Sequence, residues 1–162
     1  MLDLREQLQH CFQGRVCLIG LGNLEYGDDG FGVRLAEELR AHGNPAHVIV
    51  SGTAPERIIS RVADEGFDHI IFLDAAEFGG APGSVILLNS DELAARFPQV
   101  STHKLSLGLL AKRIEANSRS KAWLLGAQPG SVRQGAQLSQ ALQATLELLL
   151  QLLREIHLEA IA

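Results

Sequence analysis

Residues 15–32 read RVCLIGLGNLEYGDDGFG, and their pattern is the most informative in the chain about its fold class. Its first part, residues 15–20, is short, apolar and rich in β-branched and aliphatic side chains, and it stops at glycines, as a buried parallel strand does. Residues 30–41 follow with apolar side chains at helical spacing. A buried strand that passes through a glycine-rich loop into a helix predicts the first unit of a parallel α/β sheet.

The rest of the chain alternates in the same way. Further short apolar runs predict strands at residues 47–51, 68–73, 83–88 and 121–127. Helices are expected over residues 1–14, from the capping-box pattern that begins at Thr53, after Ser101 or Thr102, and from Ser139 onward. Right-handed crossovers between such strands predict an α/β fold, a three-layer α/β/α domain with a mainly parallel sheet of about five strands. No helix separates the third and fourth strands, so the fourth is expected to be antiparallel or to lie at an edge.

The apolar stripes of the last two helices can be read from their spacing. In the earlier helix the stripe is Leu107, Leu110, Ala111 and Ile114. In the later one, the long closing helix, it is Leu142, Leu146, Leu149, Leu153 and Ile156.

Composition excludes several classes of protein. The chain has 162 residues, which fits one domain, and its Lys+Arg count of 14 against 19 Asp+Glu gives a net charge of −5. This balance does not favour a surface that follows nucleic-acid phosphates. Two cysteines in a chain of this length do not make a disulfide framework, and neither a secretory signal nor a membrane span is present. We therefore expect a reduced, cytoplasmic protein that does not insert into a membrane.

Two adjacent carboxylates, Asp28 and Asp29, close the glycine-rich loop. Gly20 and Gly22 suggest a dinucleotide-binding loop, but the third glycine of that pattern is replaced by Glu25, whose charge would repel a pyrophosphate. The alternative is a structural role, because acidic groups stabilise a helix N-terminus. One carboxylate suffices for that, so we expect the other to point outward to a cation.

Two more side chains are expected at the same edge of the sheet. Asp74 follows the buried run of residues 70–73, although an aspartate there can also simply cap a turn. His103 lies at the expected start of a helix, which favours a neutral imidazole. The alternative is an exposed histidine without a functional role. Ligands bind beyond the carboxyl ends of parallel strands. Two carboxylates and an imidazole there predict an open site for a divalent ion such as Ni²⁺, Zn²⁺ or Mn²⁺.

Other catalytic arrangements are not supported. The sequence has no G-x-S-x-G nucleophile elbow, no H-E-x-x-H helix and no Walker A lysine after the glycine-rich loop. Cys17 lies inside a strand that we expect to be buried, and Cys11 lies in a helix that we expect at the surface. Neither placement favours a Cys–His nucleophile pair.

These residues resemble a known family. The stretch GLGNLEYGDDGFGVRLAEEL is similar to the opening pattern of the nickel–iron hydrogenase maturation endopeptidases, G-x-G-N-x-x-x-x-D-[DE]-G-x-G. The segments FLDAAEFGGAPGSV, STHKLSL and LLGAQP follow in the family's order, with Ala127 where the family often has isoleucine. The resemblance covers residues 15–156 of a single domain, 1–162, and leaves residues 1–14 as an N-terminal extension.

The resemblance implies a function and a site. It assigns Asp29, Asp74 and His103 as both the metal ligands and the catalytic residues. It implies an endopeptidase that removes the C-terminal extension from the nickel-loaded precursor of a nickel–iron hydrogenase large subunit. Nickel would arrive with that precursor, and zinc is an alternative occupant. We expect a monomer that binds no nucleic acid. Two alternatives stay open: a nonproteolytic nickel-binding hydrogenase assembly factor, and a nucleotide-dependent α/β enzyme.

Overall fold

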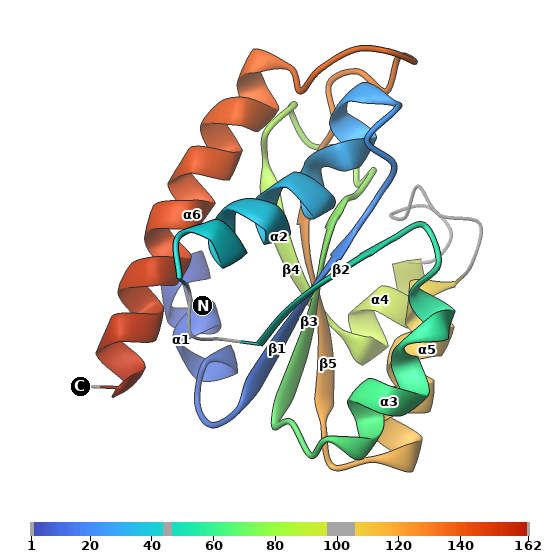
Figure 1. Ribbon diagram of the computed structural model, residues 1–162, viewed down its shortest axis with the longest axis vertical. Coiled ribbons are helices and arrows are strands. Elements are labelled where there is room, and N and C mark those ends of the chain that lie inside the picture. The colour runs from blue at the N-terminus through green and yellow to red at the C-terminus, as the bar shows by residue number, and fades with distance from the viewer. Residues whose placement is uncertain (1, 44–46, 97–105, 162) are drawn as a thin grey trace.

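The computed structural model describes residues 2–43, 47–96 and 106–161, and Figure 1 shows a twisted sheet between two layers of helices. The strands are β1 (Val16–Leu21), β2 (His47–Gly52), β3 (His69–Ala75), β4 (Val85–Asn89) and β5 (Lys121–Ala127). Their order is β2-β1-β3-β5-β4, and every pairing is parallel except that between β4 and β5. The predicted strands are confirmed, and β4 is both antiparallel and at an edge.

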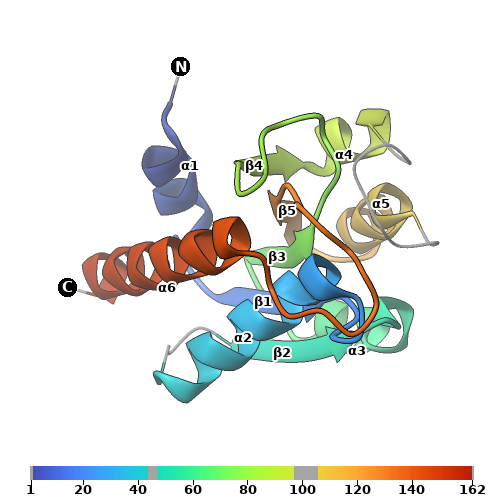
Figure 2. The ribbon, with the colours of Figure 1, turned by 90° about the horizontal axis from the view of Figure 1, so that it is seen from above.

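Helices cover both faces of the sheet, as predicted for a three-layer domain. They are α1 (Leu4–Cys11), α2 (Phe31–Ala41), α3 (Ile59–Asp64), α4 (Ser90–Arg96), α5 (Leu107–Asn117) and α6 (Gln140–Ile161). Two short 3₁₀ helices, η1 (Gly27–Gly30) and η2 (Pro55–Arg57), precede α2 and α3. Figures 1 and 2 show α1, α2 and α6 on one face and α3, α4 and α5 on the other.

Three details of the helices differ from the predictions. Helix α4 was not expected. The helix expected from Thr53 is divided into η2 and α3, and the residue that precedes η2 is Ala54, which makes no side-chain cap. The hydroxyl that caps α5 belongs to Ser106 and accepts a hydrogen bond at 3.0 Å from the N–H three residues on. Ser101 and Thr102 lie outside the described residues.

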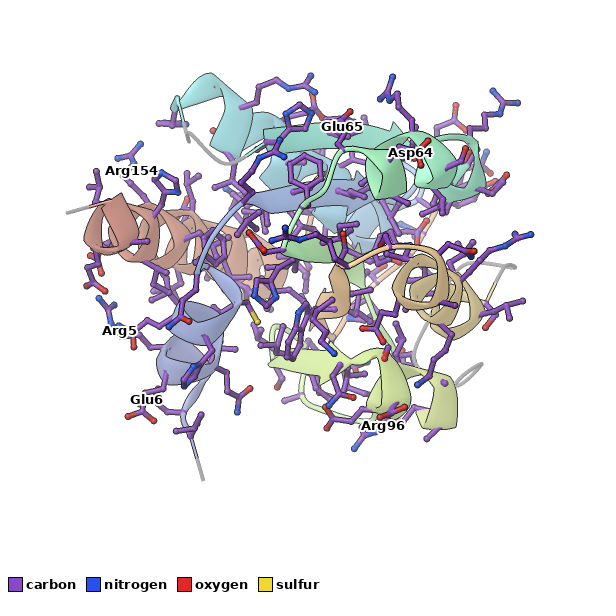
Figure 3. All side chains as sticks on the ribbon, turned by 90° about the horizontal axis from the view of Figure 1, so that it is seen from below. Arg5, Glu6, Asp64, Glu65, Arg96 and Arg154 are labelled. Atoms are coloured by element: carbon purple, nitrogen blue, oxygen red, sulfur yellow. The ribbon has the colours of Figure 1, made fainter. Side chains whose placement is uncertain are left out.

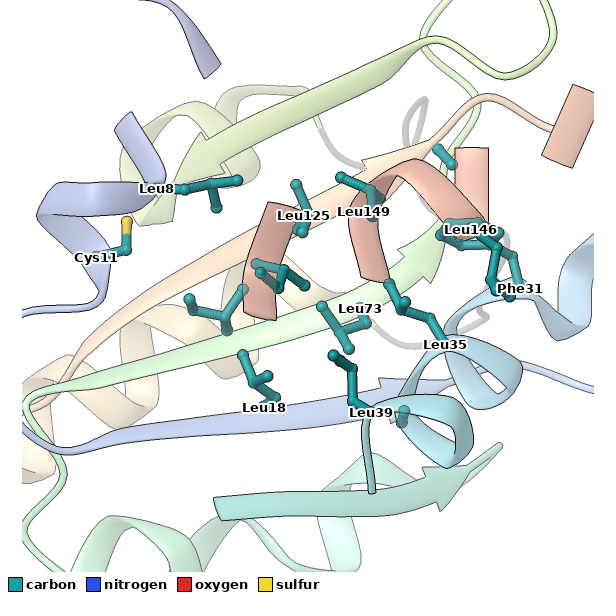
Figure 4. Close-up of a cluster of buried hydrophobic side chains, with 14 of the residues drawn as sticks. Leu8, Cys11, Leu18, Phe31, Leu35, Leu39, Leu73, Leu125, Leu146 and Leu149 are labelled. Atoms are coloured by element: carbon teal, nitrogen blue, oxygen red, sulfur yellow. The ribbon is translucent and has the colours of Figure 1, made fainter. Parts of the chain in front are cut away.

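Each face of the sheet has its own apolar cluster. Figure 4 shows the cluster between the sheet and α1, α2 and α6, where Leu18 and Leu73 of the strands lie near Leu35 and Leu149 of the helices. The predicted stripes of α5 and α6 are buried. Within the described ranges, no helix is both long and apolar enough to cross a membrane.

The N-terminal segment is part of this first cluster. Arg5 of α1 forms ion pairs with Glu155 and Glu159 of α6. Helix α1 lies at the surface, as expected, and its Cys11 faces inward and has no exposed area. Burial raises the pKa of both Cys11 and Cys17 to about 12, so neither is a thiolate near neutral pH.

The first turn of α2 lies directly on the ends of two strands. A Cβ atom at Gly32 would lie 1.9 Å from the carbonyl oxygen of Leu73 in β3 and 2.4 Å from that of Leu21 in β1. Only a glycine allows this approach, because any side chain would overlap backbone atoms that cannot move aside. The approach fixes η1, which immediately precedes α2, at the carboxyl edge of the sheet.

This contact predicts that a glycine-to-alanine substitution in a helix destabilises the protein, which is the opposite of its usual effect. Replacing a helical glycine by alanine ordinarily stabilises a protein by about 0.5–1 kcal/mol. We expect Gly32→Ala to lower the free energy of unfolding by roughly 2–3 kcal/mol, because α2 must move off the strands. Urea denaturation measures the change. Gly135→Ala is the control: it has positive φ and no neighbour within 4 Å of an added Cβ, so it should cost about 1 kcal/mol. Stabilisation by Gly32→Ala would contradict the close approach.

Candidate active site

The candidate site is built where three parallel strands end. β1 leads into η1, β3 ends one residue after Asp74, and β5 leads into the connection to α6. Figure 2 looks down on this edge and shows the β5–α6 connection passing beside η1. Segments that are far apart in the sequence therefore meet at the edge where parallel sheets bind their ligands.

Asp28 is the structural member of the acidic pair. Its side chain has no exposed area. Its Oδ2 accepts hydrogen bonds from the N–H of Gly130 at 2.8 Å, the N–H of Ser131 at 2.9 Å and the hydroxyl of Ser139 at 2.8 Å. Its Oδ1 accepts from the N–H of Ser139 at 2.7 Å. One carboxylate thus holds both ends of the β5–α6 connection against η1.

These donors also decide the protonation state of Asp28. Burial acts to raise the pKa of the carboxyl group, but the hydrogen bonds from Ser139, Ser131 and Gly130 outweigh it and hold the pKa below its usual value. Asp28 is therefore charged at neutral pH and is already fully engaged by donors within the protein. Asp28 is thus the structural acid of the pair, as one alternative of the sequence analysis expects. It binds residues 130–139 and does not cap the N-terminus of α2.

Asp29 is half-buried and belongs to the loop itself. The N–H of Asn23 donates to the Oδ2 of Asp29 at 3.1 Å and to its carbonyl oxygen at 3.2 Å. A Cβ at Gly22 would lie 2.0 Å from that carbonyl oxygen, and Gly22 has a φ of +133°. The glycine therefore permits the tight loop. The loop places Asp29 beside the end of β1.

Asp74 has no exposed area at the end of β3. Its neighbours at alternate positions, Phe72 and Ala76, belong to the cluster under α3, α4 and α5. Because successive side chains of a strand point to opposite faces, Asp74 points to that same face. The buried strand-end carboxylate expected from the sequence is therefore present, on the face of the sheet that α3, α4 and α5 cover.

His103 lies outside the described residues, so the structure does not place it. The described part of the chain supplies two of the three predicted ligands, Asp29 and Asp74, and within it no three His, Cys, Asp or Glu side chains form a metal-binding group. The first turn of α2 rests on Leu73, next to Asp74, and follows η1, which carries Asp29. The fold therefore brings these two carboxylates to one edge, and their oxygen atoms suit a borderline divalent cation.

Gln128 is an important residue whose role the sequence did not reveal. It is 4% exposed. Its Oε1 accepts from the N–H of Phe78 at 2.9 Å and of Gly80 at 3.2 Å, and its Nε2 donates to Oε1 of Glu77 at 2.6 Å. Glu77 is exposed, as expected for a loop residue. Gln128 fixes the loop that follows Asp74, and a glutamine in the G-A-Q-P segment at the end of an apolar strand was the available signal.

A separate cavity lies at the opposite edge of the sheet. It measures about 740 Å³ and includes Arg15, His47, Phe67 and His157 among its lining residues, but none of the predicted site residues. Figure 3 views this side, with Asp64 and Glu65 at the end of α3. Because ligands of parallel sheets bind at the carboxyl ends of the strands, size alone does not make this cavity the active site.

The Asp28 contacts predict a strong effect from a nearly isosteric change. Asp28→Asn places an amide group against N–H or O–H donors in either orientation, so we expect the free energy of unfolding to fall by about 3 kcal/mol at pH 7. A carboxyl group with a lowered pKa stabilises the fold above its unfolded value of about 3.9, and this contribution is lost as pH falls through the folded pKa. The difference between wild type and variant should therefore shrink below about pH 4. Denaturation across pH measures it, with Asp64→Asn at an exposed carboxylate as the control, and a difference that grows in acid would contradict the assignment.

The contact between Gln128 and Glu77 predicts that exchanging the two residue types restores the stability that the first substitution removes. Gln128→Glu keeps the acceptor for Phe78 and Gly80 but sets two carboxylates against each other, and should cost about 1–2 kcal/mol. Adding Glu77→Gln reverses the polarity of the lost hydrogen bond and should recover most of that loss. A double-mutant cycle measured by urea denaturation tests the coupling. Additive effects of the two substitutions would show that the contact does not hold the loop.

Comparisons with known proteins agree with this architecture. A family model described as hydrogenase maturation protease, HycI, matches residues 33–156. The chain is 31% identical over 158 residues to the hydrogenase 2 maturation protease of Escherichia coli, which covers 91% of this chain and 95% of that protein.

Solved structures point the same way. A [NiFe] hydrogenase maturation protease HycI from Thermococcus kodakarensis superposes with a TM-score of 0.82 at 34% identity, over 93% of this chain and 98% of that one. The hydrogenase maturating endopeptidase HybD from Escherichia coli gives a TM-score of 0.70 at 28% identity, over 85% and 88% of the two chains. These similarities favour a peptide-bond hydrolase over a nonproteolytic factor or a nucleotide-dependent enzyme. The chain belongs to the hydrogenase maturation protease family.

Proposed function

We propose that this protein is an endopeptidase that removes the C-terminal extension of the nickel-loaded precursor of a nickel–iron hydrogenase large subunit. The observation that carries the proposal is the fully buried Asp74 at the end of β3, on the edge that also carries Asp29. Family membership supports the reaction class. The three assigned residues, Asp29, Asp74 and His103, would bind the nickel ion that the precursor presents, and Zn²⁺ is an alternative occupant.

The environments of the two carboxylates suit different tasks. A carboxylate attracts a cation more strongly when it is removed from water, so the buried Asp74 is suited to hold the metal. Asp29 is half-buried, so a water molecule can reach its carboxylate. A nickel ion on the substrate would act as a Lewis acid that polarises the scissile carbonyl group.

Hydrolysis then needs one base at this edge. Asp29, released from the metal, would take a proton from the attacking water while the water oxygen bonds to the carbonyl carbon. The carbon–nitrogen bond breaks, and the proton passes to the departing amine. The metal also serves recognition in this scheme, because a precursor without nickel lacks the ion that joins substrate and enzyme.

We also propose that the chain acts as a monomer in the cytoplasm. Both faces of its sheet are covered by helices of the same chain, which supports a self-contained unit. Its two cysteines are unpaired, which fits a reducing compartment. The acidic net charge of −5 supports a protein partner rather than a nucleic acid.

The test is cleavage of purified nickel-loaded precursor, followed by mass spectrometry. Wild type should release one C-terminal peptide, and Asp29→Asn, Asp74→Asn and His103→Ala should each lower the rate by about 100-fold or more, because each removes a ligand or the base. Calorimetric titration with Ni²⁺ gives a second readout and should show weakened binding by the same variants.

Two controls separate the parts of this proposal. Asp91→Asn changes an exposed carboxylate on α4 and should cleave like wild type, and thermal denaturation checks that the site variants are folded. Normal cleavage by all three site variants would refute the site assignment. Equal cleavage of nickel-free precursor would refute the recognition role of the metal.

A further inference from the structure

Exposed apolar side chains are concentrated beside Asp29. The described residues contain seven large apolar side chains that are substantially exposed. Three of them lie in two short segments: Leu24 is 42% exposed, Tyr26 is 39% exposed and Val132 is 48% exposed. Single exposed apolar side chains need no explanation, but a group of them beside a candidate active site does.

The two segments that carry these side chains lie next to each other. The N–H of Asp28 donates to the carbonyl oxygen of Ser131 at 2.8 Å, and the N–H of Gly135 donates to that of Glu25 at 2.7 Å. Gly27 approaches so closely that an added Cβ would lie 2.8 Å from the Ser131 oxygen. Figure 2 shows this approach of the β5–α6 connection to η1. Residues 24–26 and 131–133 thus lie side by side, and their exposed apolar side chains, Leu24, Tyr26 and Val132, are here named the apolar platform.

The platform borders Asp29 directly. The N–H of Asp29 donates to the carbonyl oxygen of Tyr26 at 3.1 Å. A Cβ added at Gly30 would lie 3.1 Å from Cδ2 of Leu24, so this leucine lies over the residue after Asp29. A polypeptide whose scissile bond lies at Asp29 can therefore contact Leu24 and Tyr26.

The buried carboxylate of Asp28 makes the platform rigid. It binds the N–H groups of Gly130 and Ser131, immediately before Val132, with no exposed area of its own. A surface held in this way loses little conformational entropy when a partner binds. Exposed Glu25 and Arg133 are sequence neighbours of the apolar side chains, so charged groups accompany them in both segments.

We propose that the apolar platform of Leu24, Tyr26 and Val132 binds apolar side chains of the precursor polypeptide next to the bond that is cut, and so determines specificity. This inference rests on the proposed function. The occupant is an extended segment of the hydrogenase precursor, seated beside the metal. The platform contributes to substrate binding and takes no part in the bond-breaking step.

The experiment compares steady-state cleavage of nickel-loaded precursor by platform variants. Leu24→Ser with Val132→Ser, and separately Tyr26→Ser, should each raise KM by about tenfold while kcat stays within about twofold of wild type. Leu148→Ser is the matched control, because Leu148 is 70% exposed on α6, outside the two platform segments. Equilibrium binding of nickel-loaded precursor, measured with each platform variant combined with the cleavage-impaired Asp29→Asn, supplies a second readout and should weaken in the same variants.

The outcomes distinguish this inference from the proposed function. If wild type cleaves the precursor and the platform variants keep its KM and binding affinity, the platform is refuted and the proposed function stands. A loss shared by Leu148→Ser would also refute it, because the effect would not be specific to this surface. If wild type binds the precursor without cutting it, the proposed function fails, and the binding affinities of the variants still decide the platform. If wild type neither binds nor cuts the precursor, both fail.

Discussion

A single buried charge, the carboxylate of Asp28, organises the edge of the sheet on which the candidate site depends. A carboxylate without exposed area is unfavourable unless donors surround it, and here all four come from residues 130–139. The connection into α6 must therefore close over η1 before the charge is satisfied. Through this requirement the C-terminal part of the chain fixes the loop that carries Asp29, although more than a hundred residues separate Asp28 from Ser139.

The 3₁₀ geometry of η1 explains why the neighbouring Asp28 and Asp29 have different surroundings, one buried and one half-buried. η1 is a 3₁₀ helix, with three residues per turn, so adjacent side chains leave its axis about 120° apart. Asp28 is directed into the protein, toward the β5–α6 connection, and Asp29 is directed to the start of the loop, where it meets Asn23. A pair of consecutive aspartates in such a turn gives one structural and one available carboxylate.

The sequence predicts features that depend on local pattern and fails where distant backbone atoms decide the structure. Each strand is an apolar run that burial on both faces requires, and the α6 stripe follows from helical spacing alone. α4 was missed because only Ser90 and Leu93 of its seven residues are buried, which leaves almost no periodic signal. The role of Gln128 was missed because it binds backbone N–H groups 48 and 50 residues away, and backbone groups carry no sequence signature. Asp29 and Asp74 could be anticipated because strand ends have a fixed geometry.

The scarcity of strong ligands in this chain fits a metal that belongs to the substrate. Both thiols are buried, with pKa values raised to about 12, so neither can compete for nickel. Oxygen and nitrogen donors bind a borderline ion less tightly than thiolates do, and an incomplete set of them leaves positions for the cysteines of a partner. In the proposed reaction such a site would hold the ion long enough to align the scissile bond and would then release it with the product. A tighter site would retain the nickel, so weak ligation on a rigid edge would permit turnover.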